Sequence, residues 1–270
     1  MGSSVNSRVP IALAGLALLT AGCATDGDEP GGGVGWVSSP RTEKVTHVVL
    51  HHTVAGLGES LRILSGREPG RRVSAHYLVT DESPARVIAL VPEDRVAFHA
   101  GVSRWRAREG LNGVSIGIEI VNPDGNAHAY SDSQVAAVGG LLEDVIRRHA
   151  IDPRDIVAHS DISPGRKVDP GALFPWERLH RERGIGPWPP ADRLRAEHGS
   201  GAALPSPSEM RSLLGRWGYR VGVGPGWETA DRDALAAFQR RYRPSRVDGA
   251  PDPETAAILR VLLAAYPDTP

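Results

Sequence analysis

Histidine and aspartate residues that could hold a metal ion follow two short apolar runs of the sequence. His51 and His52 close the run VVL, and the segment HSDISPGRKVDPG, which begins at His159, follows the run IVA. Adjacent residues of a strand point to opposite faces, so only one of the two neighbouring histidines can readily face a given site. A catalytic zinc takes three protein ligands, often histidine and carboxylate, and keeps a fourth position for water. These segments contain such a set, although a histidine at a strand end is more commonly a structural hydrogen-bonding residue.

Glu119 is a charged residue in the middle of the apolar run IGIEI. Burying a carboxylate is costly, so the residue is expected either to pair with an arginine or to do chemistry. A desolvated glutamate has a raised pKa and can accept a proton from water as a general base. Lys167 lies in the histidine- and aspartate-containing segment of a chain that has only one other lysine, Lys44, among its 31 basic residues.

Strand-like and helix-like patterns alternate around these residues. A helix is predicted over 133–149, where apolar residues recur at helical spacing after Ser131 or Asp132, either of which could cap it. Shorter helices are predicted near 59–66 and 175–183. Short runs rich in valine and isoleucine predict strands at 45–50, 77–80, 87–91, 114–121 and 156–158. This alternation favours an α/β domain with a central mixed sheet flanked by helices.

The N-terminal segment has the pattern of an export signal. One basic residue, Arg8, precedes an apolar run over 9–21, which is too short to span a bilayer as a helix. The run ends in LTAGC at Cys23, the only cysteine, and this ending resembles the lipobox of bacterial lipoproteins. That resemblance implies cleavage before Cys23 and lipidation of this residue; the alternative is a free cysteine inside an ordinary cleaved signal. Residues 24–40, rich in glycine, serine, aspartate and proline, predict a flexible tether.

The C-terminal segment predicts a second, small helical domain. Apolar residues recur on three successive helical faces, and a proline- and glycine-rich linker (191–207) separates them from the middle of the chain. The pieces LLGRWGY, ALAAFQRRY and VDGAPDPETAAIL resemble the three-helix peptidoglycan-binding domain of wall hydrolases; a generic three-helix bundle is the alternative. We therefore divide the chain into 1–23 (signal), 24–40 (tether), 41–190 (catalytic), 191–207 (linker) and 208–270 (helical). Arg240, Arg241 and Arg243 are interpreted as a solvated surface.

The middle of the chain resembles the zinc-dependent N-acetylmuramoyl-L-alanine amidases of the type-2 group, related to the peptidoglycan-recognition proteins. The matching pieces occur in order: VVLHHT, SAHYLV, FHAG, SIGIEIVN and HSDISPGRKVDPG. The resemblance implies that one catalytic Zn²⁺ is held by His51, His159 and Asp169, with Asp161 as the rival carboxylate. It also implies a general-base role for Glu119 and an oxyanion-stabilising role for Lys167. By the same resemblance, the residues expected to line the substrate cleft are His76, His99, Trp105 and Asn122.

The function expected from this resemblance is cleavage of the bond between N-acetylmuramic acid and L-alanine in peptidoglycan or muropeptides, for cell-wall turnover or recycling. A non-catalytic peptidoglycan-recognition protein is the alternative, and a zinc peptidase that cuts within the stem peptide is a more distant one. The net charge of −1 argues against a nucleic-acid partner. We expect a monomer that is exported and attached to the membrane through its lipid alone. Ala24, rather than aspartate, follows the cysteine and favours the outer membrane, facing the periplasm.

Overall fold

The computed structural model describes residues 38–65, 72–125, 127–199 and 204–267. The predicted signal, its cysteine and the tether up to residue 37 therefore lie outside the described residues. No helix within the described ranges combines the length and apolar character needed to cross a membrane.

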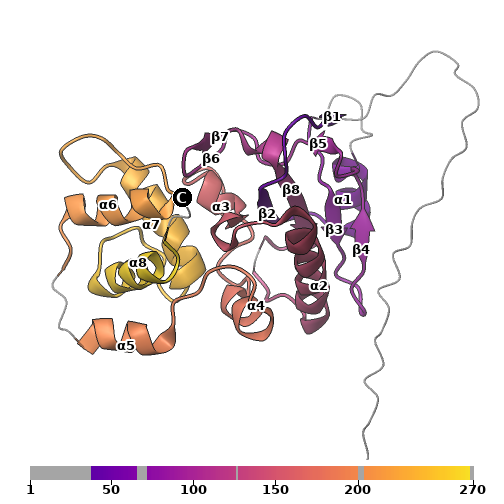
Figure 1. Cartoon of the computed structure of the whole chain (residues 1–270). Coiled ribbons are helices and arrows are strands. Elements are labelled where there is room, and N and C mark those ends of the chain that lie inside the picture. The colour runs from indigo at the N-terminus through magenta and orange to yellow at the C-terminus, as the bar shows by residue number, and fades with distance from the viewer. Residues whose placement is uncertain (1–37, 66–71, 126, 200–203, 268–270) are drawn as a thin grey trace, which may run out of the picture. The chain divides into compact units, whose positions relative to one another are not determined.

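A five-stranded mixed sheet forms the centre of the catalytic region (Figure 1). The two longest strands, β2 and β8, have the sequences HVVLHH and SIGIEI and are buried along their whole length. β8 lies between β3 and β2, β2 lies between β8 and β9, and these pairings are parallel, whereas β3 and β4 are antiparallel. This arrangement confirms the predicted α/β class. The strands in spatial order are β4 (Val87–Ala89), β3 (Tyr77–Val79), β8 (Ser115–Ile120), β2 (His47–His52) and β9 (Ile156–Ala158).

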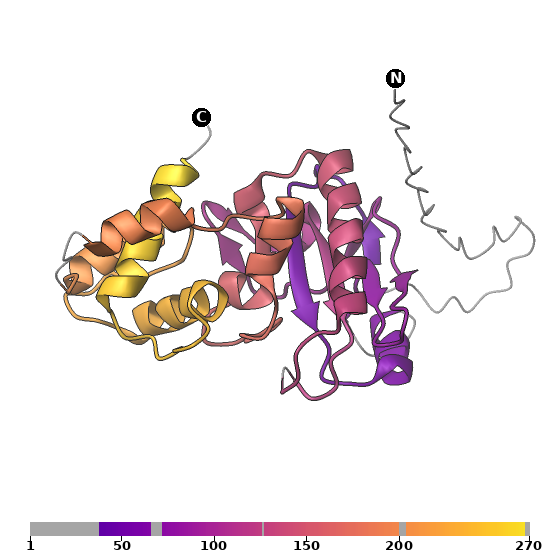
Figure 2. The same ribbon diagram turned by 90° about the horizontal axis from the view of Figure 1, so that it is seen from below.

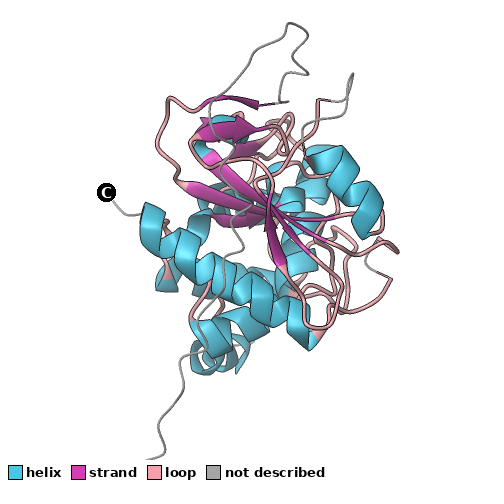
Figure 3. Ribbon diagram, turned by 90° about the vertical axis from the view of Figure 1, so that its right-hand side faces the viewer, coloured by secondary structure: helices cyan, strands magenta, loops and turns pink. Residues whose placement is uncertain are grey.

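One face of this sheet packs against the core that includes α2 (Asp132–His149) and α4 (Trp176–Arg183), and the alternate residues project from the opposite face. Val48 and Leu50 of β2 align with Ile116 and Ile118 of β8, and these four side chains belong to one buried core. That core also contains apolar residues of α2 and α4. The residues between them point to the opposite face because side chains alternate along a strand. Helices therefore lie on either side of the central strands (Figure 3).

The helix predicted over 133–149 is α2, and a capping box fixes its start. The Ser131 hydroxyl accepts from the Gln134 N–H, and the Gln134 side chain accepts from the Ser131 N–H in return. The two shorter predicted helices are also present, as α1 (Leu57–Leu64) and α4. In the catalytic region the elements that were not predicted are brief: β1 (Ser38–Pro40), β5 (Arg95–Ala97), β6 (Arg104–Trp105), β7 (Arg108–Glu109), α3 (His159–Ile162) and the 3-10 turns Leu111–Val114 and Pro153–Asp155.

The C-terminal segment folds into three helices at the positions of the predicted helical faces, preceded by a fourth helix. These are α6 (Pro207–Trp217), α7 (Thr229–Tyr242), α8 (Pro253–Ala265) and, within the segment predicted as a linker, α5 (Ala191–Gly199). They occupy the orange-to-yellow end of the chain in Figure 2. Their apolar side chains share one buried core with Val49, Val157 and Ile162 of the catalytic region. The described residues accordingly belong to a single compact unit.

One surface assignment was wrong. Arg241 and Arg243 are only 4% and 5% exposed, so they are not a solvated surface. Arg243 donates to Asp252 and Thr255 within the helical segment. Arg241 faces the catalytic region instead. Both are buried because each guanidinium finds hydrogen-bond acceptors in the interior.

Candidate active site

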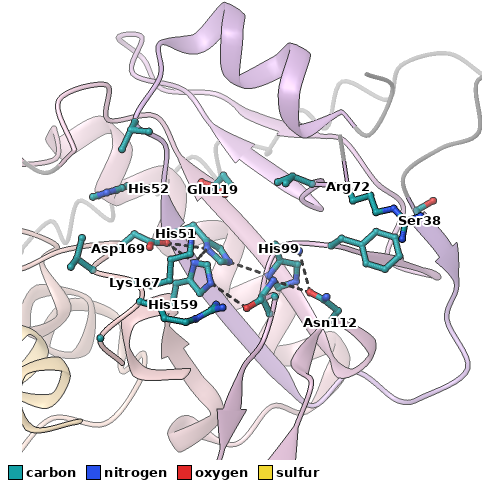
Figure 4. Close-up of a pocket in the computed structure, with 18 residues that line it drawn as sticks. Ser38, His51, His52, Arg72, His99, Asn112, Glu119, His159, Lys167 and Asp169 are labelled. Carbon is teal, nitrogen blue, oxygen red and sulfur yellow. Dashed lines mark hydrogen bonds and ion pairs between the residues drawn. The ribbon is translucent and has the colours of Figure 1, made fainter. Parts of the chain in front are cut away.

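Three of the predicted site residues meet at the carboxyl end of the sheet (Figure 4). His51 Nδ1 and His159 Nδ1 lie 2.9 Å apart, and Asp169 Oδ2 lies 3.1 Å from the first and 3.0 Å from the second. All three residues are buried. β2 carries His51 and its parallel neighbour β9 runs directly into α3, which begins at His159. The Ser160 N–H donates to the Asp169 carbonyl at 3.0 Å and draws the loop of Asp169 against α3.

A chain of hydrogen bonds fixes which nitrogen of His51 carries the proton. Ser115 Oγ donates to the Leu111 carbonyl at 2.7 Å, so it must accept from His99 Nε2, 3.2 Å away. Burial lowers the pKa of His99 well below its ordinary value, so its ring is neutral and its Nδ1 is an acceptor. That acceptor lies 3.0 Å from His51 Nε2, which therefore donates. The pKa of His51 is lowered to about 4, again by burial, so its Nδ1 presents a lone pair.

His159 is oriented in the same way. Its Nε2 lies 3.3 Å from the Ala100 carbonyl, which can only accept, so Nε2 carries a proton and Nδ1 is the ring nitrogen that faces His51 and Asp169. The Nδ1 atoms of the two histidines and Asp169 Oδ2 thus face one another at about hydrogen-bond distance. A cation bound among them would be coordinated by all three atoms. Tetrahedral zinc at its usual bond lengths separates its ligand atoms by about 3.3 Å, and the donor set suits it, so these residues fit a zinc ion.

Glu119 lies beside this cluster. It is the register partner of His51 on the neighbouring parallel strand, so both side chains project from the same face of the sheet. Its Oε2 is buried and has no hydrogen-bond partner among the described residues. Burial, together with the charge of Asp169, raises the pKa of Glu119 to about 8 against the opposing effect of Lys167. An unbonded buried carboxylate next to three metal-type ligands is placed to exchange protons with a molecule in the pocket.

A pocket of about 1000 Å³ opens over these groups, and His52, His99 and Lys167 also line it. The polar lining residues that lie outside the predicted site and its motif segments are Ser38, Arg72 and Asn112. Asn112 Oδ1 accepts from the N–H groups of His99 and Ala100 at 3.1 and 2.8 Å. Asn112 therefore holds the FHAG segment beside the metal-type ligands. No motif marks these three residues in the sequence, because their role depends on which loops meet.

Only His99 of the four predicted cleft residues lines this pocket. His76 is fully buried beneath β8, and its Nδ1 accepts from the Gly117 N–H at 2.9 Å. Trp105 is buried in the core that also contains Val49, and its ring packs edge-on against Tyr219. Asn122 donates to the His128 carbonyl. None of these three residues lines the pocket.

Asp161, the rival ligand, points away from the cluster. Both of its carboxylate oxygens are used by donors from other segments, including Tyr219 and Arg241. The group of described residues that could hold a metal ion therefore contains Asp169 and not Asp161.

The sheet and this site together define a peptidoglycan amidase. Residues 41–172 match the Amidase_2 family, described as N-acetylmuramoyl-L-alanine amidase. The N-acetylmuramoyl-L-alanine amidase AmiD of Escherichia coli strain K12 is 38% identical over 239 residues, which cover 83% of this chain and 84% of AmiD. The chain therefore belongs to the N-acetylmuramoyl-L-alanine amidase family and is an enzyme of that class.

Further relatives extend the comparison. The 1,6-anhydro-N-acetylmuramyl-L-alanine amidase AmpD of the same E. coli strain is 38% identical over 108 residues, 40% of this chain and 57% of AmpD. A solved complex of E. coli AmiD with anhydro-N-acetylmuramic acid-L-Ala-D-gamma-Glu-L-Lys superimposes with a TM-score of 0.73 at 36% identity, covering 82% of this chain and 90% of that one. The structure of AmpDh3 from Pseudomonas aeruginosa, in complex with anhydromuramic pentapeptide, superimposes with a TM-score of 0.75 at 35% identity. The match covers 84% of this chain and 94% of AmpDh3.

Proposed function

We propose that this amidase is zinc-dependent and hydrolyses the amide bond between the lactyl group of N-acetylmuramic acid and L-alanine. The observation that carries the proposal is the convergence of three metal-type ligand atoms, on His51, His159 and Asp169, beside the unbonded carboxylate of Glu119. A recognition protein without activity would have no need of a costly, unpaired buried carboxylate at this point.

The residues of the pocket divide the chemistry among them. A zinc ion held by the three ligands would supply polarisation of the amide carbonyl and activation of water. Glu119, whose buried Oε2 has no hydrogen-bond partner among the described residues, accepts a proton from the attacking water. It then returns this proton to the nitrogen of L-alanine as the amide bond breaks. Lys167, on the pocket wall, stabilises the negative charge that develops on the carbonyl oxygen.

The test is mass spectrometry of purified muropeptides incubated with the mature chain, with Glu119→Ala and a chelated sample as controls. Release of intact stem peptide from the sugar, lost in both controls and restored by zinc to the chelated sample, is the expected result. Cleavage within the stem peptide would convert the proposal into a peptidase. Binding without any product would leave a recognition protein.

We also propose that muropeptides ending in anhydro-N-acetylmuramic acid are among the substrates. Two similar structures contain such ligands, and both cover more than four fifths of this chain. Digesting anhydro and intact muropeptides of the same stem peptide in parallel tests this. Comparable kcat/KM values would indicate an enzyme of general wall turnover, and a large preference for the anhydro form would indicate recycling.

Lipid attachment at Cys23 and outer-membrane location are proposals that rest on the sequence LTAGCA. Labelling of the wild-type chain, but not of Cys23→Ala, by radioactive palmitate in a bacterial host is expected. Density-gradient separation of the membranes then tests the location, with Ala24→Asp as the variant expected to stay in the inner membrane. Palmitate incorporation into Cys23→Ala would contradict the assignment.

We further propose that residues 208–270 bind the polymeric wall and so raise the local concentration of substrate. The support is the sequence resemblance of three segments that fold as α6, α7 and α8. Hydrogen exchange of the full-length Glu119→Ala variant with solubilised glycan strands is the test. Protection within 208–270 is expected, and protection confined to the catalytic region would contradict the proposal.

A further inference from the structure

Asp161 ties the start of α3 to the helical C-terminal segment. One residue of α3, His159, belongs to the proposed zinc site, and Asp161 lies two positions further along the same turn. Asp161 is 1% exposed, and its Oδ2 accepts from the Ala158 N–H at 2.9 Å, immediately before His159. The carboxylate thus closes the turn that carries the ligand, in the manner of a capping interaction.

The other donors to this carboxylate come from the C-terminal helices and the turn between them. Tyr219, in the turn after α6, donates its hydroxyl to Asp161 Oδ1 at 2.5 Å. Arg241, on α7, lies 3.2 Å from Asp161 Oδ2 and also donates to the Ile156 carbonyl of β9 at 2.9 Å. The Arg241 guanidinium stacks on the Trp176 ring with 3.8 Å between its central carbon and the ring centre.

The approach of Tyr219 to this point depends on its neighbour Gly218. The glycine has a φ of 140°, and a Cβ there would lie 3.0 Å from the Trp105 ring. Its carbonyl accepts from the Arg106 N–H at 2.8 Å. The backbone and the side chain of this turn therefore both hydrogen-bond to the catalytic region. Such contacts are expected of a segment held in a fixed position and not of a loosely tethered domain.

We propose that Tyr219 and Arg241 are positioning residues of the amidase site, which hold α3 through Asp161 and thereby fix the zinc ligand His159. The effect extends to a second ligand because the Ser160 N–H of the same turn bonds the Asp169 carbonyl. The helical segment is then a structural part of the catalytic centre as well as the proposed wall-binding unit. This inference rests on the proposed zinc site.

The test compares two tyrosine-to-phenylalanine variants of the full-length chain. Tyr219→Phe removes the hydroxyl that binds Asp161, and Tyr242→Phe removes a buried hydroxyl of α7 that has no hydrogen-bond partner among the described residues. Zinc dissociation constants are measured by chelator competition at a temperature where circular dichroism shows both variants fully folded. Supporting groups around metal ligands commonly alter affinity about 10-fold to 100-fold, and this one acts through a backbone turn, so about 5-fold to 20-fold is expected.

For Tyr219→Phe we expect weaker zinc binding and a lower kcat with an unchanged KM for a soluble muropeptide, and for Tyr242→Phe neither change. An unaltered zinc dissociation constant for Tyr219→Phe, or an equal change in both variants, would overturn the proposal. If Tyr219→Phe does not fold, Asp161→Asn, which retains an acceptor oxygen, is measured in its place with the same expectation. Failure of the zinc site itself is distinguishable, because the wild-type chain would then bind no zinc.

Discussion

His51 and Glu119 are paired in register on two neighbouring parallel strands, β2 and β8, and project from the same face of the sheet. This relationship places a proton acceptor beside a metal-type ligand without help from any loop. Because both strands are buried along their length, the two side chains are held by the most rigid part of the fold. Three successive residues on this face of β8 serve the site: Ser115 bonds His99, Gly117 makes room for its ring, and Glu119 reaches the pocket.

Glu119→Gln should abolish most of the activity while leaving the zinc site intact. The amide keeps the shape of the side chain but cannot accept the proton of water, and general-base catalysis contributes about 10²- to 10⁴-fold. A fall in kcat of that size, with zinc content by elemental analysis unchanged, is expected. Loss of zinc together with activity would show that Glu119 acts on the metal ligands instead.

Gly117→Ala should weaken zinc binding although Gly117 touches none of the ligands. A Cβ at this position would lie 2.4 Å from the His99 ring, which must then move away from His51. We expect zinc affinity to fall about 10-fold or more, with stability reduced by about 1–3 kcal/mol. Gly140→Ala on α2, where a Cβ would meet nothing within 4 Å, is the control and should leave zinc affinity unchanged. Equal zinc affinities for the two variants would contradict this account of His99.

In the metal-free protein the buried Glu119 carboxylate should destabilise the fold, by an amount that depends on pH. In the metal-free fold burial and the charge of Asp169 raise its pKa from 4.5 to about 8, so the folded chain holds a proton that the unfolded chain releases between these values. Stability of the metal-free wild type must therefore fall as the pH rises from 4.5 to 8. Metal-free Glu119→Gln should be more stable than wild type by about 2–4 kcal/mol at pH 9 and nearly equal to it at pH 4.5. Urea unfolding at both pH values measures this, and parallel pH profiles for the two proteins would refute it.

Glu93 should stabilise the fold at neutral pH and lose this effect in acid. Burial alone would raise its pKa, but hydrogen bonds from Arg148, Tyr77 and His149 lower it to about 2. The folded pKa is below the ordinary value of 4.5, so the stabilisation is complete above pH 4.5 and is lost as the pH falls towards 2. Glu93→Gln should cost about 1–3 kcal/mol at pH 7 and flatten the acid limb of the stability curve.

The matched control for Glu93 is Glu82→Gln. Glu82 forms an exposed pair with Arg86 on the surface, so its loss should change unfolding little. Urea denaturation between pH 2 and 7 compares the two variants. If Glu82→Gln were as destabilising as Glu93→Gln, the burial of the Glu93 network would not be the cause.

Local periodicity and residue type determined much of this protein. The helix over 133–149 and the buried strands were evident from apolar spacing, because each element must turn one face to a core. His51, His159 and Glu119 could be singled out because metal binding and proton transfer require those side chains whatever surrounds them. Asp169 was preferred to Asp161 only through the resemblance of its segment to the amidases. The segment order of the motifs was enough to indicate the amidase family.

Only the tertiary structure decided which residues share a face and which segments meet. His76, Trp105 and Asn122 were expected in the cleft, yet all three are buried and none lines the pocket. Asp161 and Arg241 are far apart in the sequence, so no local pattern could reveal their buried ion pair. Strand order, register and contacts between distant segments arise from packing over the whole chain, whereas periodicity reports only the immediate neighbours of each residue.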